Sequence, residues 1–571
     1  MRIITLHCDY IKFQPLKKAV KSAEELSSKN EIQVEEPLVV LTAIEKGDSA
    51  STRKQLVESV SKTAKEVNAK HIVLYPYAHL SSNLAAPETA MSALVEAEKS
   101  LKKLGFNVTR APFGYYKTFE LKCKGHPLSE LSKEFRPEGT EEPTKPRKLV
   151  EETYDPARFL KEISRSKLDT SKLKENDHRI LGQKLDLFSF NEVAPGMVFW
   201  HNNGLTIYNE LVRYWREEHK KAGYKEISTP QILDKKLWQI SGHWDKYKEN
   251  NFVTTYEERP FLIKPMNCPG GILVFKTQTR SYKDLPMRVG ELGIVHRQEL
   301  SGVLAGLFRV IKFTQDDAHI YCTDETLEQE LIAVIDLTDK FYKKFNLPYR
   351  IELSTRPKER IGSDEIWDKA EKALEQVLKK KKIKYKLNKG DGAFYGPKID
   401  FHIKDSLNRE WQCATLQLDF AMPERFQLEY TGKDNKRHTP IMLHRTIYGA
   451  LERFIGILLE HTNGNLPLWL SPTQVRVINF TDRNNKAVEK LVKDIKKEIP
   501  HLRIDTDLEN TTVSDKVRQA EIQRIPYIIV IGDKEEKAKT LAVRSRGEKP
   551  KFGVKLDSFI KDVREKIEKR I

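Results

Sequence analysis

The chain has 571 residues, of which 32% are charged, and its formal net charge of +17 favours a polyanionic partner such as nucleic acid, although solubility explains the excess equally simply. This length allows three or four domains that each bury a core, and no apolar run reaches the length of a membrane span. The start, MRIITLHCDY, indicates no signal peptide, and five cysteines without a CxxC spacing argue against a disulfide framework and for the reducing cytoplasm.

Residues 1–134 show the pattern of a small α/β domain. Strands are predicted at 3–6, 38–44 and 72–75, with a helix at 53–69. A second helix, closed by Gly105, follows from one apolar stripe made of Ala90, Met91, Leu94, Ala97, Leu101 and Leu104. Lysine, histidine, tyrosine and carboxylate side chains gather near the predicted strand ends. They are suited to a hydrolytic pocket, but spacing alone favours ordinary solvation of strand ends.

Three segments in this domain carry a more specific signal: LHCDYIKF, YPYAHLSSNLA and APFGYYKTFELKCKGHPLSEL. They resemble the N-terminal editing domain of archaeal threonyl-tRNA synthetases, which shares its fold with D-aminoacyl-tRNA deacylases. The resemblance implies hydrolysis of seryl-tRNA that carries the threonine anticodon, through Lys117, His79, Tyr116 and Glu130 around an activated water. A lysine beside a ribose hydroxyl and a water can orient the attack and stabilise developing charge. Cys8 stands where the family often has serine, a small change that we expect hydrolysis to tolerate.

Residues 135–176 are predicted to form a linker. The segment FRPEGTEEPTKPRK is rich in proline, glutamate, lysine and threonine, a composition typical of an exposed domain boundary. A charged stretch with helical spacing follows at 149–160.

From Asp177 onwards aromatic residues and glycines enter the apolar runs. HRILGQKLDLF and APGMVFWHNNGLTIYNELVRYW lead into an amphipathic helix with Ile207, Leu211 and Tyr214 on one face, and a short strand follows. Residues 288–322, RVGELGIVHRQELSGVLAGLFRVIKFTQDDAHIYC, predict an antiparallel hairpin with an anion-binding arginine on each limb. Two alternating strands, FYGPKIDF and WQCATLQLDF, and a helix in HRTIYGALERFIGILLE complete this region.

In this order the stretches resemble motifs 1, 2 and 3 of the class II aminoacyl-tRNA synthetases. With RPFLIKPMNCPG, residues 177–470 resemble the antiparallel-sheet catalytic domain of threonyl-tRNA synthetases. The resemblance implies a homodimer, built through motif 1, that ligates L-threonine to threonine tRNA by way of a threonyl-adenylate, with ATP and Mg²⁺. Two anions meet in such a reaction, so fixed positive charge must cancel their repulsion.

By the same resemblance, Arg297 lies between the substrate carboxylate and the α-phosphate, and Glu299 holds the adenine amine. Arg309 binds the phosphate tail and Arg453 the region of the γ-phosphate. Further contacts to threonine, ATP or the tRNA end are expected from Lys398, Tyr395, Gln315, Gln412 and Gln417.

Threonine specificity is expected to depend on zinc, with Cys268, His319 and His444 as ligands and Asp317 as acceptor of the threonine hydroxyl proton. Three protein ligands leave positions open for a substrate that brings a hydroxyl, which valine lacks. Serine has the hydroxyl and lacks only a methyl group, so an editing domain is needed. The ligands are too far apart for a local metal motif, so zinc is implied by the resemblance alone, and Cys322 is an alternative ligand.

Residues 471–571 predict a compact α/β domain. The strand patterns QVRVINF, LRIDTDL, PYIIVIGD and TLAVRSR alternate with helical patterns at 485–499, 513–524 and 556–567. The domain resembles the anticodon-binding domain of several class II synthetases, which implies that Asn510, Glu535 and Arg544 read anticodon bases. The basic clusters are open to a second interpretation as solvated helix faces.

In the catalytic region, three residues depart from the family pattern, namely Leu300 for proline, Gly271 for histidine and Ala450 for serine. None removes a predicted ligand or arginine, so we expect catalysis to be retained. Two alternatives are an editing-only protein with a silent core, which the intact arginines disfavour, and a synthetase for proline or serine. Proline has no hydroxyl for the predicted zinc set and Asp317 to recognise. The core resembles the widespread bacterial-like form, whereas the front domain resembles the archaeal type, which leaves the source open beyond an archaeal hint.

Overall fold

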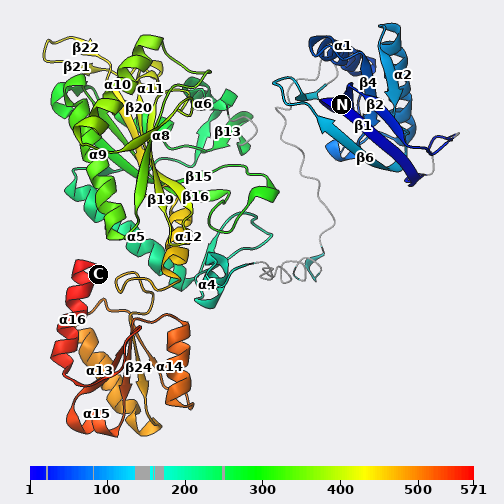
Figure 1. Ribbon diagram of the computed structural model, residues 1–571. Helices are drawn as coiled ribbons and strands as arrows, with labels where there is room; N and C mark the ends of the chain where they lie inside the picture. The colour runs from blue at the N-terminus through cyan, green and yellow to red at the C-terminus, as the bar shows by residue number, and fades with distance from the viewer. Residues whose placement is uncertain are drawn as a thin grey trace. The chain divides into compact units, whose positions relative to one another are not determined.

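The structure is a computed structural model that describes residues 1–20, 23–26, 28–81, 83–135, 155–157, 160, 173–246 and 251–571. The chain divides into two compact units, Met1–Leu149 and Val150–Ile571 (Figure 1). The predicted linker at 135–176 and the predicted helical stretch at 149–160 lie largely outside the described residues.

The N-terminal unit contains a seven-stranded sheet in the order β2-β1-β3-β4-β5, with β6 and β7 also paired to β1. Its strands are β1 (Arg2–Lys18), β2 (Ile32–Glu35), β3 (Pro37–Ala43), β4 (His71–Pro76), β5 (Asn107–Arg110), β6 (Tyr115–Cys123) and β7 (Glu130–Glu134). The first part of β1 lies between β3 and β7, and its second part between β2 and β6. The predicted strands and helices of this domain are confirmed, although β1 is far longer than its predicted core.

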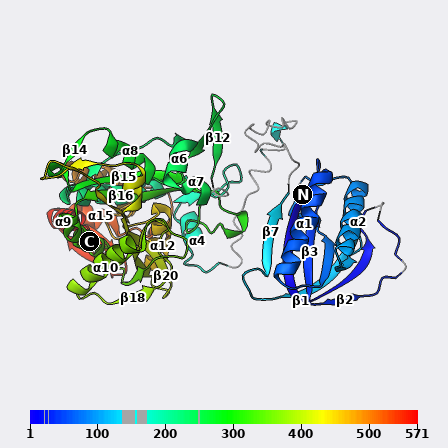
Figure 2. The same cartoon turned by 90° about the horizontal axis from the view of Figure 1, so that it is seen from above.

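Two helices, α1 (Ala50–Glu66) and α2 (Pro87–Lys103), lie together on one face of this sheet (Figure 2). Leu38 and Val40 of β3 pack against them, whereas Val39 and Leu41 face a second cluster on the other side. This alternation follows from the two-residue period of a strand. The short helix η1 (Ala78–Leu80) follows β4.

The second unit is built on an eight-stranded sheet in the order β10-β15-β16-β23-β20-β19-β17-β18. The strands are β10 (Lys225–Glu226), β15 (Met287–His296), β16 (Lys312–Cys322), β17 (Tyr349–Ser354), β18 (Tyr385–Asn388), β19 (Lys398–Lys404), β20 (Glu410–Asp419) and β23 (Ile441–Thr446). All neighbours run antiparallel except the two edge pairs, β10–β15 and β17–β18. The predicted hairpin at 288–322 is formed by β15 and β16, joined by a loop at 297–311.

The larger helices around this sheet are α4 (His178–Lys184), α5 (Asn202–Lys221), α8 (Cys268–Lys276), α9 (Asp324–Lys344), α10 (Asp364–Lys380) and α12 (Leu451–Thr462). Tyr214 and Trp215 of α5, Phe341 of α9 and Leu374 of α10 belong to one continuous core with the strands. Smaller elements are α6 (Lys235–Ser241), α7 (His243–Lys246), α11 (Ala421–Arg425), β8 (Phe188–Ser189), β9 (Phe199–Trp200), β11 (Ile232–Asp234), β12 (Val253–Tyr256), β13 (Arg259–Ile263), β14 (Arg280–Ser281), β21 (Tyr430–Thr431) and β22 (Arg437–His438).

The chain ends in a five-stranded sheet in the order β25-β24-β26-β27-β28. Its elements are β24 (Val475–Asn479), α13 (Asn485–Glu498), β25 (Ile504–Asp507), α14 (Val513–Ile522), β26 (Tyr527–Ile531), α15 (Asp533–Ala538), β27 (Leu541–Ser545), β28 (Lys551–Val554) and α16 (Leu556–Lys569). Arg503 and Arg570 bond to Glu210 and Glu217 of α5, which ties this domain to the large sheet. Among the described residues, no helix is long and apolar enough to cross a membrane.

Candidate catalytic and editing sites

A cavity of about 680 Å³ opens above the large sheet and contains every residue predicted for the catalytic domain. Its walls come from the loop at 297–311, the strands β16, β19, β20 and β23, and the first turns of α8 and α12. The predicted residues that line it are Cys268, Arg297, Glu299, Arg309, Gln315, Asp317, His319, Tyr395, Lys398, Gln412, Gln417, His444 and Arg453.

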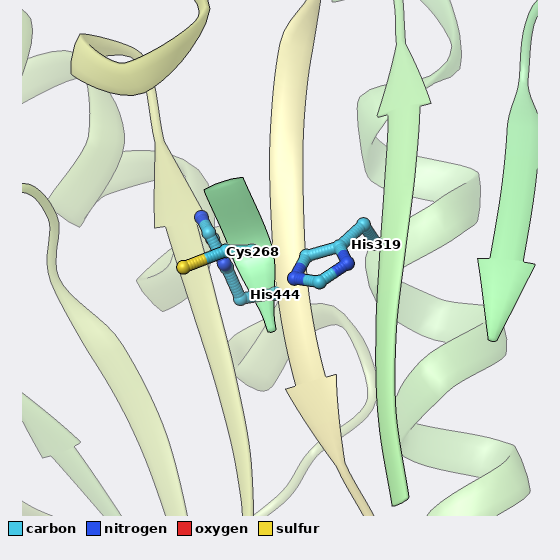
Figure 3. Close-up of side chains that lie close together, drawn as sticks. All are labelled: Cys268, His319 and His444. Atoms are coloured by element: carbon cyan, nitrogen blue, oxygen red, sulfur yellow. The ribbon is translucent and has the colours of Figure 1, made fainter. Parts of the chain in front are cut away.

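Three buried side chains at the base of this cavity form a group that can hold a metal ion. Cys268 is the first residue of α8, and His319 and His444 are direct register partners on β16 and β23. The sulfur atom and one nitrogen of each ring all lie within 4.8 Å of one another (Figure 3). Burial lowers the pKa of His319 well below its ordinary value, so this ring is neutral, as a metal ligand must be. Cys322, the alternative ligand, is buried on β16 and does not belong to the group.

Two residues orient side chains here: Asp419 contacts a candidate ligand, and Asn267 contacts the neighbouring Asp317. Asp419, at the end of β20, lies 2.8 Å from Nε2 of His444 through one carboxylate oxygen. This contact holds the His444 ring and leaves its Nδ1 for a metal, as carboxylates beside metal-bound histidines commonly do. Asn267, the residue before Cys268, donates from its amide to Asp317 at 2.6 Å. Burial raises the pKa of Asp317, and the Asn267 hydrogen bond opposes that rise.

The predicted arginines line the same cavity. Arg297 donates to the carbonyl oxygen of Pro265 at 3.1 Å and lies over the ring of Phe313. Arg309 is half exposed and forms an ion pair with Glu299 at 2.9 Å, so these two predicted ATP contacts bond to each other here. Arg453 donates from Nε to the carbonyl oxygen of Phe308 at 2.9 Å, which leaves the two terminal nitrogens of its guanidinium for an anion.

The remaining predicted contacts come from three strands and a turn: Lys398 lies on β19, Gln412 and Gln417 on β20, Gln315 on β16, and Tyr395 in the turn before β19. Lys398 bonds to Asp400, which also accepts from Gln412 at 2.5 Å. The hydroxyl of Tyr395 donates to Gln417 at 2.8 Å. Within the described part of the chain, the buried Oε1 of Gln315 has no hydrogen-bond donor, so this acceptor is available to a ligand. These side chains therefore present donors and acceptors to the cavity.

Asp316, next to Asp317, has a structural task. It is fully buried and accepts hydrogen bonds from the backbone N–H groups of Ile447, Tyr448 and Gly449 at 2.9–3.1 Å. Burial raises the pKa of Asp316 to about 7. The contact holds the turn between β23 and α12 against β16, and so sets where α12 begins.

In the N-terminal unit, Lys117 lies on β6 in a partly buried position. Its amine donates to the carbonyl oxygens of Pro112 and Tyr115 at 2.9 and 3.2 Å and lies 5.1 Å from the centre of the Tyr75 ring. Burial lowers the pKa of Lys117 to about 8. An amine that titrates near neutral pH inside an aromatic pocket is a feature of functional sites.

The other predicted editing residues are more exposed. His79, in η1, contacts Tyr77, which in turn contacts Tyr75, so His79 and Lys117 border one aromatic cluster. Tyr116 is 57% exposed and lies on the other face of β6 from Lys117, near Lys17. Glu130 pairs with Leu6 on β1, whereas Lys117 pairs with Pro15. Within the described residues of this unit, Glu130 and Lys117 therefore lie at different places along β1.

In the C-terminal domain, the predicted anticodon residues fall into two groups. Asn510 follows β25 and Glu535 follows β26. Because both strands are parallel to β24, the two residues lie at the same end of the sheet, beyond the carboxyl ends of these strands. Arg544 lies on β27 opposite Ile528, near the start of β26 and so closer to the opposite end of the sheet. It pairs with Glu521 of α14 at 3.1 Å.

Comparisons with known proteins agree with this architecture. Residues 1–135 match the model of the archaea-specific editing domain of threonyl-tRNA synthetase. Residues 252–462 match the class II tRNA synthetase core domain (G, H, P, S and T), and residues 474–566 match an anticodon binding domain. A solved structure, the RNA binding domain of threonyl-tRNA synthetase from Cryptosporidium parvum, is 39% identical with a TM-score of 0.66, and the alignment covers 68% of this chain and 98% of that one.

The chain belongs to the threonyl-tRNA synthetase family.

A second solved member of the family, the putative threonyl-tRNA synthetase ThrRS-1 of Aeropyrum pernix, is 30% identical with a TM-score of 0.61, over 69% of this chain and 96% of that one. The threonine–tRNA ligase of Desulforamulus reducens is 52% identical over 397 residues, 70% of this chain and 62% of the relative. That of Desulfatibacillum aliphaticivorans is 51% identical over 427 residues, 74% and 66% respectively. The chain thus spans less than two thirds of the length of these curated relatives. The predicted family and fold class are confirmed.

The three departures from the threonyl-tRNA synthetase pattern lie in different environments. Leu300 is 79% exposed on the loop at 297–311, and Ala450 is the N-cap residue of α12. Gly271 lies against a predicted metal ligand, because a Cβ atom there would come 3.1 Å from Nδ1 of His319. A side chain at 271 would therefore press on the His319 ring.

Sequence reasoning did not single out Asn267, Asp419 or Phe313. Asp419 stands near the end of the strand pattern WQCATLQLDF and Phe313 near the start of β16, where a polar or aromatic residue is unremarkable by itself. Asn267 could have been found from the sequence, because it is a polar residue that directly precedes the candidate ligand Cys268.

Proposed function

We propose that the protein is a threonine–tRNA ligase. It activates L-threonine with ATP and Mg²⁺ as the threonyl-adenylate, passes threonine to threonine tRNA, and hydrolyses seryl-tRNA in its N-terminal domain. The proposal is supported chiefly by one observation: Cys268, His319 and His444 lie in the same cavity as Asp317 and Arg297. A metal site beside a carboxylate selects an amino acid that carries a hydroxyl group. An arginine in the same cavity suits the substrate carboxylate and the phosphate that react.

Zinc fits the residues at the base of the cavity. One thiol and two imidazoles are a donor set that zinc prefers, and Asp419 supports one of the two imidazoles. When bound, zinc supplies Lewis acidity and open positions for the amine and hydroxyl of threonine, and valine offers no hydroxyl to occupy them.

The chain's own groups then perform the positioning and charge stabilisation. Asp317, held by Asn267, accepts a hydrogen bond from the threonine hydroxyl. Arg297 binds between the substrate carboxylate and the α-phosphate, where charge develops as the phosphoanhydride bond breaks. Arg309 exchanges Glu299 for the phosphate tail of ATP, which frees the Glu299 carboxylate to accept from the adenine amine.

Recognition of the tRNA anticodon and editing of the product use the other two domains. Asn510, Glu535 and Arg544 contact the anticodon, and the net charge of +17 favours tRNA as the partner. In the N-terminal domain Lys117, His79, Tyr116 and Glu130 serve the hydrolysis of seryl-tRNA. We further infer a homodimer that forms along α5, the motif 1 helix, and a cytoplasmic location, in keeping with five free cysteines.

Pyrophosphate exchange with each amino acid tests the activation step. The purified protein should exchange pyrophosphate into ATP with threonine and weakly with serine, and valine should give no more than background. Removal of metal by a chelator should abolish the exchange, and zinc should restore it. Exchange that depends on proline, or threonine exchange that is unaffected by chelation, would refute the proposal.

A further inference from the structure

His178, in the HRILGQKLDLF segment, is buried outside the predicted substrate contacts and touches the loop at 297–311. It is the first residue of α4 and 1% exposed. Its backbone N–H and its Nδ1 both bond to Oε1 of Glu460, at 3.0 and 2.6 Å. Glu460 lies in the last turn of α12 and also accepts from Arg409 at 2.5 Å. His178 thus links α4 to the far end of the motif 3 helix.

The other ring nitrogen of His178 bonds to the loop itself. The backbone N–H of Leu307 donates to Nε2 at 2.9 Å. Because Nε2 is the acceptor there, the ring carries its proton on Nδ1 and donates it to Glu460. Although Asp177, His178 and Glu460 lie close enough together to hold a metal, both ring nitrogens of His178 already have partners. The His178 ring therefore bridges Glu460 and the backbone of Leu307 by hydrogen bonds.

The loop is shaped to reach His178. Gly306 has a φ of +53°, and a Cβ atom there would lie only 2.2 Å from Nε2 of His178. A side chain at 306 would both strain the backbone and occupy the space of the imidazole. The glycine thus permits the close approach that lets Leu307 bond to the ring.

Both ends of helix α12 are bonded to the loop at 297–311, one to Phe308 and the other to Leu307. Arg453 in its first turn donates to the carbonyl oxygen of Phe308 at 2.9 Å, and Glu460, about two turns further on, holds Leu307 through His178. Between them Gly456 leaves room for the Phe308 ring, to which an added Cβ would come within 3.0 Å. That ring also contacts the rings of His178 and Trp411 in tilted arrangements, at centroid distances of 4.2 and 4.4 Å.

We propose that His178 is a positioning residue for the ATP half of the catalytic site, which it serves by fastening the root of the loop at 297–311 to α12. The fastened residues immediately precede Arg309, and Arg453 is bonded to one of them. The tip of the loop is left free, since Leu300 is 79% exposed and an added Cβ at Gly302 would meet nothing within 4 Å. Two phosphate-binding arginines are thereby set before ATP arrives, which lowers the cost of binding it. This inference rests on the proposed ligase activity.

Two substitutions each remove one of the two hydrogen bonds made by the His178 ring. His178→Asn keeps a donor near the position of Nδ1 for Glu460 and loses the acceptor for Leu307. His178→Gln does the reverse. A buried N–H left without an acceptor costs free energy, so His178→Asn should raise the KM for ATP about tenfold. His178→Gln should change that KM by less than about threefold, and neither variant should change the KM for threonine by more than about twofold.

A matched control is His219→Gln, because His219 is also a buried histidine with a backbone bond, to Trp215 at 2.6 Å, and it does not touch the loop. It should lower thermal stability and leave the KM for ATP unchanged. If His178→Asn raises the KM values for ATP and threonine equally, or behaves as His219→Gln does, the positioning role is wrong.

An activity-independent readout distinguishes failure of this inference from failure of the proposed function. Hydrogen exchange of the peptide that contains the Leu307 amide should be faster in His178→Asn than in the wild type, and unchanged in His178→Gln. If exchange is faster in His178→Asn but the wild type shows no ligase activity, the proposed function is refuted and the loop anchor is kept. Unchanged exchange in His178→Asn would overturn the anchor itself.

Discussion

His319 and His444 face each other across the neighbouring strands β16 and β23, with ring centroids 5.1 Å apart and ring planes at 88°. The two residues are register partners, so the antiparallel pairing alone brings them together from distant parts of the sequence. A slip of one residue would turn one of the rings to the opposite face of the sheet. The candidate metal group is therefore a consequence of strand register, completed by Cys268 at the start of α8.

Loss of Asp419 should weaken metal binding. In Asp419→Ala, the His444 ring loses the carboxylate that orients it, and zinc affinity should fall by about 10- to 100-fold. Competition with a chromogenic chelator measures this directly. Asp391→Asn is the control, since Asp391 is an exposed carboxylate that pairs with Lys398 and not with a candidate ligand. Equal zinc affinity in Asp419→Ala and the wild type would contradict the assignment.

Substitution of Arg297 by alanine should affect chemistry far more than folding. The side chain lies in the cavity wall and contributes no part of the apolar core, so its removal should leave the unfolding temperature nearly unchanged. Threonine-dependent pyrophosphate exchange should fall by about 100-fold or more, because the charge that develops at the α-phosphate loses its partner. A variant that unfolds instead would show that Arg297 is a structural residue.

The adjacent carboxylates Asp316 and Asp317 should behave in opposite ways. Asp316→Ala leaves three buried N–H groups of the 447–449 turn without an acceptor and should destabilise the catalytic domain by about 2–4 kcal/mol. Asp317→Asn should leave stability nearly unchanged and raise the KM for threonine. Thermal unfolding and pyrophosphate exchange, measured on both variants, separate the two roles. Similar losses of stability in both would contradict them.

The editing reaction should lose activity as pH rises through about 8, where the buried Lys117 amine gives up its proton. Its pKa is lower in the folded than in the unfolded chain, so this group makes the domain more stable as pH rises from about 8 towards 10.5. Activity and stability should thus change in opposite directions over this range. Lys117→Arg keeps its charge, so any activity that remains should show no decline near pH 8. A decline at the same pH in Lys117→Arg would assign it to another group.

The elements were predictable where one pattern dominates a segment. The stripe from Ala90 to Leu104 is helix α2, and the hairpin predicted at 288–322 is formed by β15 and β16. The prediction of an arginine on each limb was wrong, because β15 ends at His296 and β16 begins at Lys312, so Arg297 and Arg309 both lie in the connecting loop. FYGPKIDF was less regular, because the chain turns at Phe394 and Tyr395 and becomes a strand only at Lys398.

The sites depended on contacts that no local pattern contains. Cys268, His319 and His444 were named through family resemblance, since only the register of β16 and β23 and the position of α8 bring them together. The Glu299–Arg309 ion pair was not foreseen, because each residue was assigned a separate part of ATP. His178 bonds to a glutamate 282 positions away and to the loop at Leu307, and its own segment gives no hint of either partner.

Charging of threonine tRNA with threonine and with serine, followed by the decay of each product, tests the central claim most directly. The wild-type protein should accumulate stable threonyl-tRNA and almost no seryl-tRNA. Lys117→Ala should accumulate both, because ligation continues and hydrolysis is lost. Absence of threonyl-tRNA, or seryl-tRNA that accumulates equally in the wild type and in Lys117→Ala, would contradict the assignment of a ligase with an editing domain.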